Sequence, residues 1–380
     1  FMLKLVSKIL YYRRAKQMEI NRLRLNQYRS YAALDLRPGP GINAIVGDNA
    51  EGKTNSVEAV FLCAFGRSHR TSRDAELIMR GCAGGYVGAE LTNNTGSHLI
   101  EIKLRDGERK KIFIDRQMAS RSGELMGLLN VVMFAPEDLS IVKDGPAERR
   151  RFMELSQTHP AYYYSLQRYN SALKQRNALL KEPDRIGPGM LETWDEQLSA
   201  LGEEIVMDRC EFIDGLSTIA YDLHKSITGG RERLEIVYEP DIDPEDPEGI
   251  YGAMLKALDR SRAEDLRRGF TTAGPHRDDI GIALSGIDVR TFGSQGQKRT
   301  AALSLKLSEL AFIREIKEEA PVLILDDVLS ELDEGRQQLL MESMKDCQCF
   351  LTCTSLEGLK RAGLGNMKVF RCKGGEMRPE

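Results

Sequence analysis

The sequence predicts an α/β fold with two lobes: a head that combines a mixed sheet with an antiparallel β subdomain, and a mostly helical lobe inserted into that head. Three observations lead to this prediction. A strand, a glycine-rich turn and a helix follow one another near residue 47, strands dominate both ends of the chain, and long helices dominate its middle. The 380 residues, 41% of them hydrophobic, are enough to bury two cores. We assign residues 18–134 and 278–380 to the head, lobe I, and residues 135–277 to the helical lobe II.

Residues 1–17 are basic and mildly amphipathic, and Lys4 and Lys8 interrupt their apolar residues. No small-residue cleavage site follows, which disfavours a signal peptide. We interpret this segment as a poorly ordered extension outside the native fold, with a membrane-surface helix as the alternative. Met18 is then the expected natural start. No apolar run approaches the ~20 residues that a membrane span needs, so we expect no membrane partner.

Short apolar runs predict the strands of the head. The expected strands cover residues 19–25, 31–36, 42–46, 131–134, 279–284, 287–292, 349–353 and 367–372, with a β-meander over residues 86–117. Residues 322–325 are all apolar and precede two aspartates, which is typical of a central parallel strand buried on both faces. Helices are expected over residues 55–65, 297–318 and 334–345.

The middle of the chain has a helical character. Residues 146–226 predict long helices that are broken near Pro160 and at residues 183–189. An acidic loop over residues 241–248 precedes a further helix near residues 250–268.

A phosphate-loop pattern, two glycines separated by four residues and followed by lysine and threonine, is the strongest functional signal. Its members are Gly47, Asp48, Asn49, Ala50, Glu51, Gly52, Lys53 and Thr54. Glycines let the backbone wrap closely around phosphate oxygens, and the helix that begins near Lys53 turns its partly positive end toward them. A chance glycine-rich turn is the alternative, and the flanking strand and helix disfavour it. We therefore predict that these residues and Asn55 bind a nucleotide.

The predicted chemistry needs a metal ligand opposite the phosphate loop. In phosphate-loop enzymes the threonine hydroxyl ligates Mg²⁺ and the lysine reaches the β- and γ-phosphates, which gives these roles to Thr54 and Lys53. Asp326 ends a buried strand, where a second metal ligand is expected. Asp327 would orient or deprotonate the attacking water. The alternative is an aspartate pair that only forms a turn and caps a helix.

Two further stretches point to contact with a second subunit. Ser294, Gln295, Gly296 and Gln297 open the helix predicted over residues 297–318 and would form another anion-binding helix terminus. Such a second site would cap the γ-phosphate held by another subunit. Ser330 and Asp333 follow the aspartate pair closely, as a dimer-facing loop would. An ordinary helix N-cap is the alternative in each case.

Together, in this order and spacing, these motifs resemble the ATP-binding cassette superfamily. The resemblance makes Ser294–Gln297 the signature motif, which acts on the partner's nucleotide, and Ser330–Asp333 the D-loop. Typical members carry glutamate after the metal-binding aspartate, where this chain has Asp327, so slow hydrolysis is expected. The histidine of the next strand is missing, and Thr352 and Thr354 stand near its place.

A closer resemblance, from Met18 onward, is to the RecF family of bacterial recombination mediators. Five stretches carry it: residues 26–31 (NQYRSY), 66–70 (GRSHR), 134–139 (FAPEDL), 274–279 (GPHRDD) and 325–333 (LDDVLSELD). It implies a cytoplasmic, nucleoid-associated ATPase that forms an ATP-dependent homodimer and binds DNA, including gapped and junction DNA. It further implies that RecO and RecR are partners in loading the recombinase, and that Arg29 lies near the bound nucleotide.

Local basic clusters are the candidate DNA contacts, because a net charge of -3 excludes a protein that coats nucleic acid through bulk charge. The candidates are Arg67, Arg70 and Arg73, then Arg149, Arg150 and Arg151, and finally Arg260, Arg262, Arg267 and Arg268. Solvated arginines that contact no nucleic acid are the alternative in each case. No basic stripe interleaved with aromatic residues is present, which favours contact with a duplex backbone. We expect a structural role for His276 as readily as a catalytic one.

Two other functions remain open from the sequence. One is the head of another SMC-like complex, although no sustained heptad of coiled-coil arms is visible. The other is a scaffold that binds nucleotide without turnover and recruits partner proteins. Seven scattered cysteines without a C-x-x-C pair favour reduced thiols, and we expect Cys347, Cys349 and Cys353 to be buried apolar residues rather than metal ligands.

Overall fold

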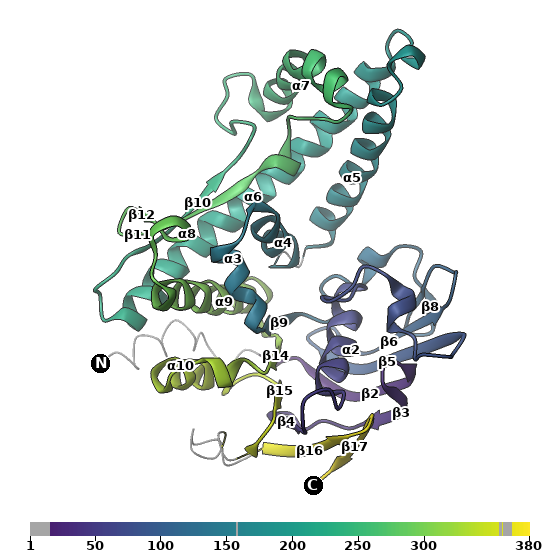
Figure 1. Cartoon of the computed structure of the whole chain (residues 1–380), viewed down its shortest axis with the longest axis vertical. Coiled ribbons are helices and arrows are strands. Elements are labelled where there is room, and N and C mark those ends of the chain that lie inside the picture. The colour runs from purple at the N-terminus through teal and green to yellow at the C-terminus, as the bar shows by residue number, and fades with distance from the viewer. Residues whose placement is uncertain (1–15, 157–158, 357–358, 360–366) are drawn as a thin grey trace. The chain divides into compact units, whose positions relative to one another are not determined.

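The computed structural model describes residues 16–156, 159–356, 359 and 367–380, which form two compact units (Figure 1). The first unit comprises the chain up to Leu139, Ser226–Gly229 and Ala302–Glu380, and the second comprises Ser140–Lys225 and Gly230–Ala301. Most of the predicted extension, residues 1–15, lies outside the described residues. Lys16–Gln17, however, form strand β1, which pairs in parallel with β13 (Glu319–Ala320). These two residues therefore belong to the fold, contrary to the prediction.

A six-stranded mixed sheet forms the centre of the first unit. Its order is β17 (Glu376–Pro379), β16 (Met367–Lys373), β4 (Ile42–Val46), β15 (Cys349–Cys353), β14 (Val322–Asp326) and β9 (Val131–Phe134). All neighbours are parallel except β17. Every residue of β14 is buried, as its apolar run predicts. The carboxyl ends of β4, β14, β15 and β9 consequently lie along one edge of the sheet.

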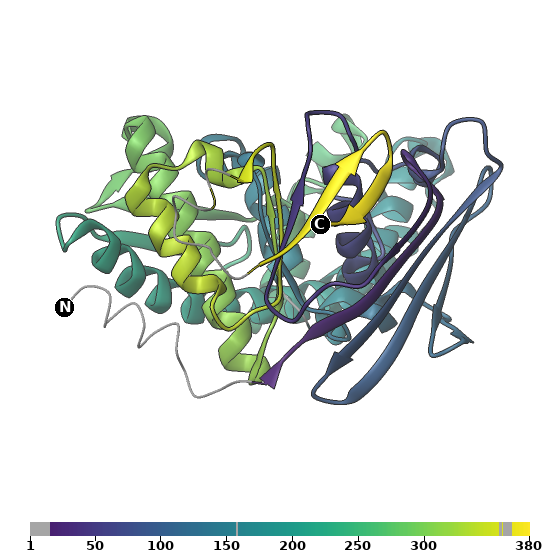
Figure 2. The ribbon, with the colours of Figure 1, turned by 90° about the horizontal axis from the view of Figure 1, so that it is seen from below.

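A second, antiparallel sheet completes the core of this unit. Its order is β3 (Tyr31–Leu36), β2 (Glu19–Tyr28), β5 (Gly84–Asn93), β6 (Gly96–Arg105), β7 (Lys111–Ile114) and β8 (Gln117–Met118), which confirms the predicted meander. Helix α2 (Lys53–Phe65) contacts strands of both sheets (Figure 1 and Figure 2). Because it lies between two sheets, it buries every residue from Ser56 to Phe65 and not only the predicted apolar face.

Shorter helical segments follow the strands of the first unit. They are η1 (Asp74–Leu77), η2 (Ser122–Leu125), η3 (Pro136–Asp138), the C-terminal part of α9 (Gln295–Lys317), η6 (Val328–Glu331) and α10 (Glu334–Met344). All seven cysteines are free thiols, and both Cys347 and Cys349 are buried while Cys353 is partly buried. No group of three or more potential ligands that could hold a metal occurs within the described ranges.

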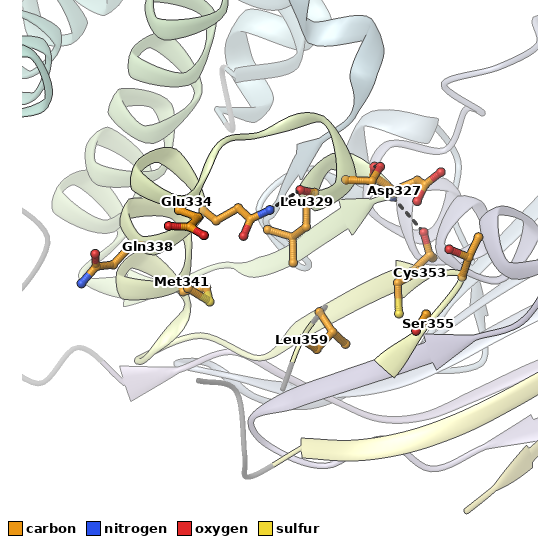
Figure 3. A pocket seen from close by; sticks show the side chains of 12 residues that line it. Asp327, Leu329, Glu334, Gln338, Met341, Cys353, Ser355 and Leu359 are labelled. Atoms are coloured by element: carbon orange, nitrogen blue, oxygen red, sulfur yellow. Dashed lines mark hydrogen bonds between the residues drawn. The ribbon is translucent and has the colours of Figure 1, made fainter. Parts of the chain in front are cut away.

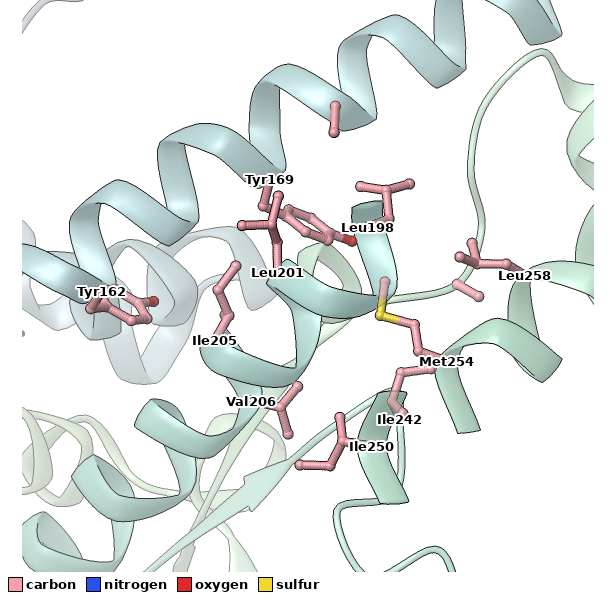
Figure 4. Close-up of a cluster of buried hydrophobic side chains, with 12 residues drawn as sticks. Tyr162, Tyr169, Leu198, Leu201, Ile205, Val206, Ile242, Ile250, Met254 and Leu258 are labelled. Atoms are coloured by element: carbon pink, nitrogen blue, oxygen red, sulfur yellow. The ribbon is translucent and has the colours of Figure 1, made fainter. Parts of the chain in front are cut away.

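The second unit is mostly helical, as predicted. Its helices are α3 (Leu139–Lys143), α4 (Pro146–Ser156), α5 (Pro160–Leu180), η4 (Pro183–Arg185), most of α6 (Met190–Thr228), α7 (Gly249–Arg268), η5 (Pro275–Arg277) and the start of α9. Tyr162 and Tyr169 of α5 pack with Leu201 of α6 and Met254 of α7 in its core (Figure 4). The breaks at Pro160 and at residues 183–189 are confirmed.

A buried cation joins three helices of this unit. Arg176 of α5 is fully buried and donates to Asp195 of α6 and to Asp265 of α7, each at 2.6 Å. It also donates to Thr271 at 2.9 Å. Two carboxylates and a hydroxyl compensate the loss of hydration of the guanidinium, and such a network is costly to break on one side only.

The predicted boundary at residue 278 differs from the observed one. Strand β11 (Asp279–Leu284) pairs with β10 (Leu234–Glu239) and with β12 (Ile287–Asp288), so residues 278–301 belong to the second unit. The strand predicted over residues 287–292 is also wrong in its second half. Val289–Phe292 form the short helix α8, because Asp288 caps it by accepting a hydrogen bond from Thr291 N–H at 2.7 Å.

Candidate nucleotide-binding site

The loop between β4 and α2 has a shape that depends on glycine. Gly52 has a φ of 109°, and a Cβ atom at this position would lie 2.6 Å from Ser30 Oγ. Gly52 and Lys53 are buried, whereas Asp48, Asn49 and Ala50 are exposed at the crest of the loop. Lys53 Nζ donates to the carbonyl oxygens of Gly47 at 2.7 Å and Asp48 at 2.9 Å. The ammonium group therefore lies inside the loop, held by the backbone that surrounds it.

Two hydroxyl groups and one carboxylate meet at the edge of the sheet. Thr54 Oγ1, at the start of α2, donates to Asp326 Oδ1 at 3.1 Å. Thr352 Oγ1, near the end of β15, donates to the same oxygen at 2.6 Å. The structure thus brings Thr54 and Asp326 together across 272 positions of sequence separation. Burial raises the pKa of Asp326, an effect that the hydroxyls of Thr352 and Thr54 oppose.

These oxygen atoms fit a magnesium ion. Mg²⁺ is usually held by one or two carboxylates together with phosphate oxygens and water. One carboxylate and one hydroxyl are therefore a suitable set of ligands for the protein to supply. A cation beside the buried Asp326 would also favour its ionised form, against the effect of burial.

Asp327 differs from its neighbour in both conformation and surroundings. Its φ is 53°, in the left-handed region, which costs a non-glycine residue on the order of 1–3 kcal/mol. Its N–H donates to Thr352 Oγ1 at 3.0 Å, and its carbonyl accepts from Ser330 Oγ at 2.8 Å. These backbone bonds hold the residue in place, while its carboxylate accepts no hydrogen bond from the part of the chain that the structure describes.

A pocket of about 660 Å³ opens beside this carboxylate (Figure 3). It is lined by Asp327, Leu329 and Ser330, by Glu334, Gln337, Gln338 and Met341 of α10, and by Thr352, Cys353, Thr354, Ser355 and Leu359. Gln337 Nε2 donates to the carbonyls of Leu329 at 2.8 Å and Leu332 at 3.0 Å, which fixes α10 to the loop after β14. Asp327 thus lies in the lining of an open pocket.

Glu51 faces away from the interior of the phosphate loop. Its carboxylate accepts a hydrogen bond from Gly374 N–H in the turn between β16 and β17. Its carbonyl accepts from Gly375 N–H at 3.3 Å and from the Cys372 thiol at 3.2 Å. The C-terminal hairpin therefore supports the phosphate loop from outside, and the Glu51 side chain helps to hold the loop in position.

Arg29 forms an ion pair inside the protein. Its Nε and Nη2 donate to the two carboxylate oxygens of Glu58 at 2.9 and 2.7 Å, and its Nη1 donates to the Glu76 carbonyl at 2.8 Å. Burial opposes ionisation of Glu58, but hydrogen bonds from Arg29 and Ser68 hold the pKa of its carboxyl below the usual range. Asn55 is similarly engaged, since its amide donates to Ser30 Oγ and accepts from Arg70, each at 3.0 Å.

The two predicted subunit-facing stretches form helix caps. Ser294 N–H donates to Gln297 Oε1 at 2.8 Å and Gln297 N–H donates to Ser294 Oγ at 3.2 Å, a reciprocal cap at the start of α9. Asp333 caps α10 by accepting from Arg336 N–H at 3.0 Å. Ser294, Gln295 and Gly296 are nevertheless exposed, as are Ser330 and Asp333.

The basic clusters divide into buried, paired and exposed residues. Arg149 is 4% exposed and donates to both carboxylate oxygens of Asp279 at 2.6 and 2.8 Å, so its prediction as a DNA contact is wrong. Arg73, Arg262, Arg267 and Arg268 all have carboxylate partners. Arg70 is exposed and also lies 3.8 Å from a Glu58 carboxylate oxygen. Arg67, Arg151 and Arg260 are exposed, and Arg150 is partly exposed.

One acidic residue at the site was missed by the sequence analysis. Glu137 is exposed and follows β9, which is the parallel neighbour of β14, and its negative charge adds to the raised pKa of Asp326. The signal was available, because an apolar strand followed by an acid is the same pattern that identified Asp326.

Comparison with known proteins agrees with this geometry. The family model described as "RecF/RecN/SMC N terminal domain" matches residues 19–377. The DNA replication and repair protein RecF of Clostridium perfringens is 42% identical over 95% of this chain and 99% of its own length. Its counterpart from Alkaliphilus oremlandii is 41% identical over 95% of this chain and 100% of its own. The chain belongs to the RecF family.

Solved structures support the same RecF assignment. The recombination mediator RecF with ATP in the RecFOR pathway has a TM-score of 0.89 and 33% identity, covering 96% of this chain and 98% of that one. An Smc head domain from Pyrococcus furiosus has a TM-score of 0.56 and 17% identity, which shows a shared fold alone. The predicted fold class, an ATP-binding-cassette type of head with a helical insertion, is thus confirmed, and another SMC-like head is the weaker match. Across the described residues, no helix combines the length and apolar character needed to span a membrane.

Proposed function

We propose that this RecF-family chain is an ATP-dependent DNA-binding protein of recombinational repair and replication restart. The observation that carries the proposal is the 3.1 Å contact between Thr54 Oγ1 and Asp326 Oδ1, which joins the phosphate loop to the end of the central strand. Relatives described as DNA replication and repair proteins, and a RecF structure whose description includes ATP, support the same function.

The residues of the site take distinct roles in this proposal. The phosphate loop, Gly47 to Asn55, surrounds the phosphates of ATP, and Lys53 contacts the β- and γ-phosphates. Thr54 and Asp326 would hold Mg²⁺, which neutralises charge on those phosphates. Arg29 pairs with the buried Glu58 of α2 and thereby holds this helix in place beside the nucleotide. Asp327 orients the water that attacks the γ-phosphate, and the pocket beside it provides access.

ATP binding would then control assembly. Ser294–Gln297 of one copy cap the γ-phosphate held by a second copy, and Ser330 and Asp333 face that copy, so ATP drives dimerisation. The short side chain of Asp327 makes hydrolysis slow, and hydrolysis releases the dimer. In this proposal the dimer binds gapped or junction DNA, and RecO and RecR are partners in loading the recombinase in the cytoplasm, at the nucleoid.

A nucleotide-binding scaffold without turnover is the alternative function. Asp327→Asn separates the two, because it removes the water-orienting carboxylate while preserving side-chain size. We expect loss of ATP hydrolysis and accumulation of an ATP-bound dimer, measured by phosphate release and sedimentation. Asp106→Asn, at an exposed turn of the antiparallel sheet, is the matched control and should change neither. A wild-type protein that binds ATP but releases no phosphate, with or without DNA, would support the scaffold.

A further inference from the structure

The turn Gly274–Asp279 of the second unit is held by a buried charge network. Asp278 is fully buried, and its carboxylate accepts from Arg209 Nη1 at 2.6 Å, from Asp241 N–H at 2.9 Å and from the Tyr238 hydroxyl. Arg209, itself 1% exposed, also donates to the Pro275 carbonyl at 2.6 Å. The turn is therefore fixed at both its start and its end.

His276 holds the centre of the same turn. Its Nε2 donates to the Thr271 carbonyl at 3.1 Å, so its Nδ1 is an acceptor and receives the Tyr169 hydroxyl at 2.8 Å. Burial lowers the pKa of the imidazole, which keeps it neutral. Gly274 has a φ of 125°, and a Cβ atom there would lie 2.5 Å from the Tyr169 hydroxyl oxygen. Both ring nitrogens of His276 are thus engaged in a structural role.

Arg277 is the exposed member of this turn, whose other residues are buried or partly buried. Within the described residues its guanidinium forms no ion pair and no hydrogen bond, whereas Arg149 and Arg209 are neutralised by Asp279 and Asp278. Arg150 of α4 lies beside it and donates Nη1 to the Asp278 carbonyl at 2.7 Å, again without a carboxylate partner. Burial lowers the pKa of Arg150, and the positive charges of Arg209 and Arg277 add to this effect.

We propose that Arg150 and Arg277 form a binding site for the phosphate backbone of nucleic acid, presented by the rigid turn Gly274–Asp279. Four arginines lie at this turn together with Asp241, Asp278 and Asp279. Arg149 is paired with Asp279 and Arg209 with Asp278. Asp241 is committed to the turn, because its carboxylate accepts from Gly274 N–H at 2.7 Å. Two guanidinium groups therefore remain for a ligand. Guanidinium groups suit phosphates because they supply both positive charge and several N–H donors.

The rigidity of the turn favours this assignment over a merely solvated arginine pair. The turn fixes the backbone of Arg277, and Arg150 is held by its hydrogen bond to the Asp278 carbonyl, so less conformational entropy is lost on binding a phosphate than with arginines on a mobile loop, which improves affinity. This inference rests on the proposed DNA-binding function and specifies one surface for it.

The test is the salt dependence of duplex binding by the full chain in the presence of ATP and Mg²⁺. Arg277→Gln and Arg150→Gln should each lower the slope of log affinity against log salt concentration by about one, and the double variant by about two. Arg277→Lys should retain most of the slope, because a phosphate contact needs the charge. Arg267→Gln is the control in the same unit, since Arg267 is exposed but paired with Glu264, and it should keep the wild-type slope.

Melting temperature and ATP affinity are the controls that separate a loss of DNA contact from a loss of folding. Arg277 is exposed and makes no contact with a carboxylate, so Arg277→Gln should leave the melting temperature and ATP affinity unchanged. An unchanged slope in Arg277→Gln and in the double variant, with wild-type protein that binds DNA, would overturn this inference and leave the proposed function intact. Wild-type protein that binds no DNA with ATP would overturn both.

Discussion

Thr352 and Asp326 are joined by a hydrogen bond of 2.6 Å between the ends of the adjacent strands β15 and β14. Thr352 also accepts the N–H of Asp327 at 3.0 Å, so one hydroxyl positions both aspartates of the site. A threonine does not titrate near neutral pH, unlike the histidine of related ATP-binding cassettes. Its contribution is therefore positional, and it fixes the carboxylate that we propose as a metal ligand.

Replacing Thr352 tests whether its hydroxyl positions the two aspartates. Thr352→Val preserves shape but leaves the Asp327 N–H without its acceptor and the buried Asp326 carboxylate with the hydrogen bond from Thr54 alone, which typically costs about 1–3 kcal/mol in the free energy of unfolding. Thr352→Ser keeps the hydroxyl and should cost much less. Urea unfolding of the three proteins measures the difference, and equal stability of the Val and Ser variants would contradict this role.

The contact between Glu51 and the C-terminal hairpin predicts an effect on nucleotide affinity. Glu51→Ala removes the bond to Gly374 N–H and loosens the loop, so we expect ATP binding to weaken by roughly tenfold, the value of one ordinary hydrogen bond. Calorimetric titration with ATP provides the measurement. Glu376→Ala, an exposed change on the same hairpin, is the control, and equal affinities of the two variants would argue against support by this carboxylate.

The ion pair of Arg29 and Glu58 predicts a pH dependence of stability. The folded-state pKa of Glu58 is depressed, so its contribution is present above the unfolded pKa of about 4.3 and is lost as pH falls through the folded value. Glu58→Gln should therefore destabilise the protein at pH 7, by about 2 kcal/mol, and this deficit should shrink below about pH 4. Unfolding curves across this range test the sign, and a deficit that stays constant with pH would exclude the mechanism.

The buried network of Arg176 predicts a large loss of stability. Arg176→Ala leaves the buried Asp265 without its cation and leaves Asp195 with Arg262 alone, and breaking a buried ion pair on one side typically costs about 3–5 kcal/mol. Thermal unfolding of the full chain measures this effect. Arg267→Ala breaks only an exposed pair and should leave the melting temperature nearly unchanged, so similar losses in both variants would contradict the account.

Much of the site was predictable because its signals are local. The phosphate loop combines glycine, lysine and threonine at fixed spacing, and β14 is apolar at each position before Asp326, so both could be located from neighbouring residues alone. The sheet rule that parallel strands end at one edge then predicts that Thr54 and Asp326 approach each other. Their observed contact is the outcome of that rule.

The wrong predictions concern features that depend on contacts beyond the local sequence pattern. Arg149 lies in a run of three arginines that suggests an exposed face, but its partner Asp279 is 130 positions away and only the fold reveals the pair. Residues 289–292, with valine, threonine and phenylalanine, favour a strand by composition, whereas the cap from Asp288 forms a short helix. The boundary at residue 278 failed for a related reason, because β11 pairs with the unpredicted strand β10.

The most direct test of the central claim is sedimentation of wild-type protein and Lys53→Met, with and without ATP, Mg²⁺ and a gapped duplex. Lys53 lies inside the phosphate loop, so its loss should abolish the response to ATP without altering the fold. The account predicts a dimer that retains DNA for wild type with ATP, and a monomer without DNA for Lys53→Met. ATP-independent DNA binding by a wild-type monomer would contradict it.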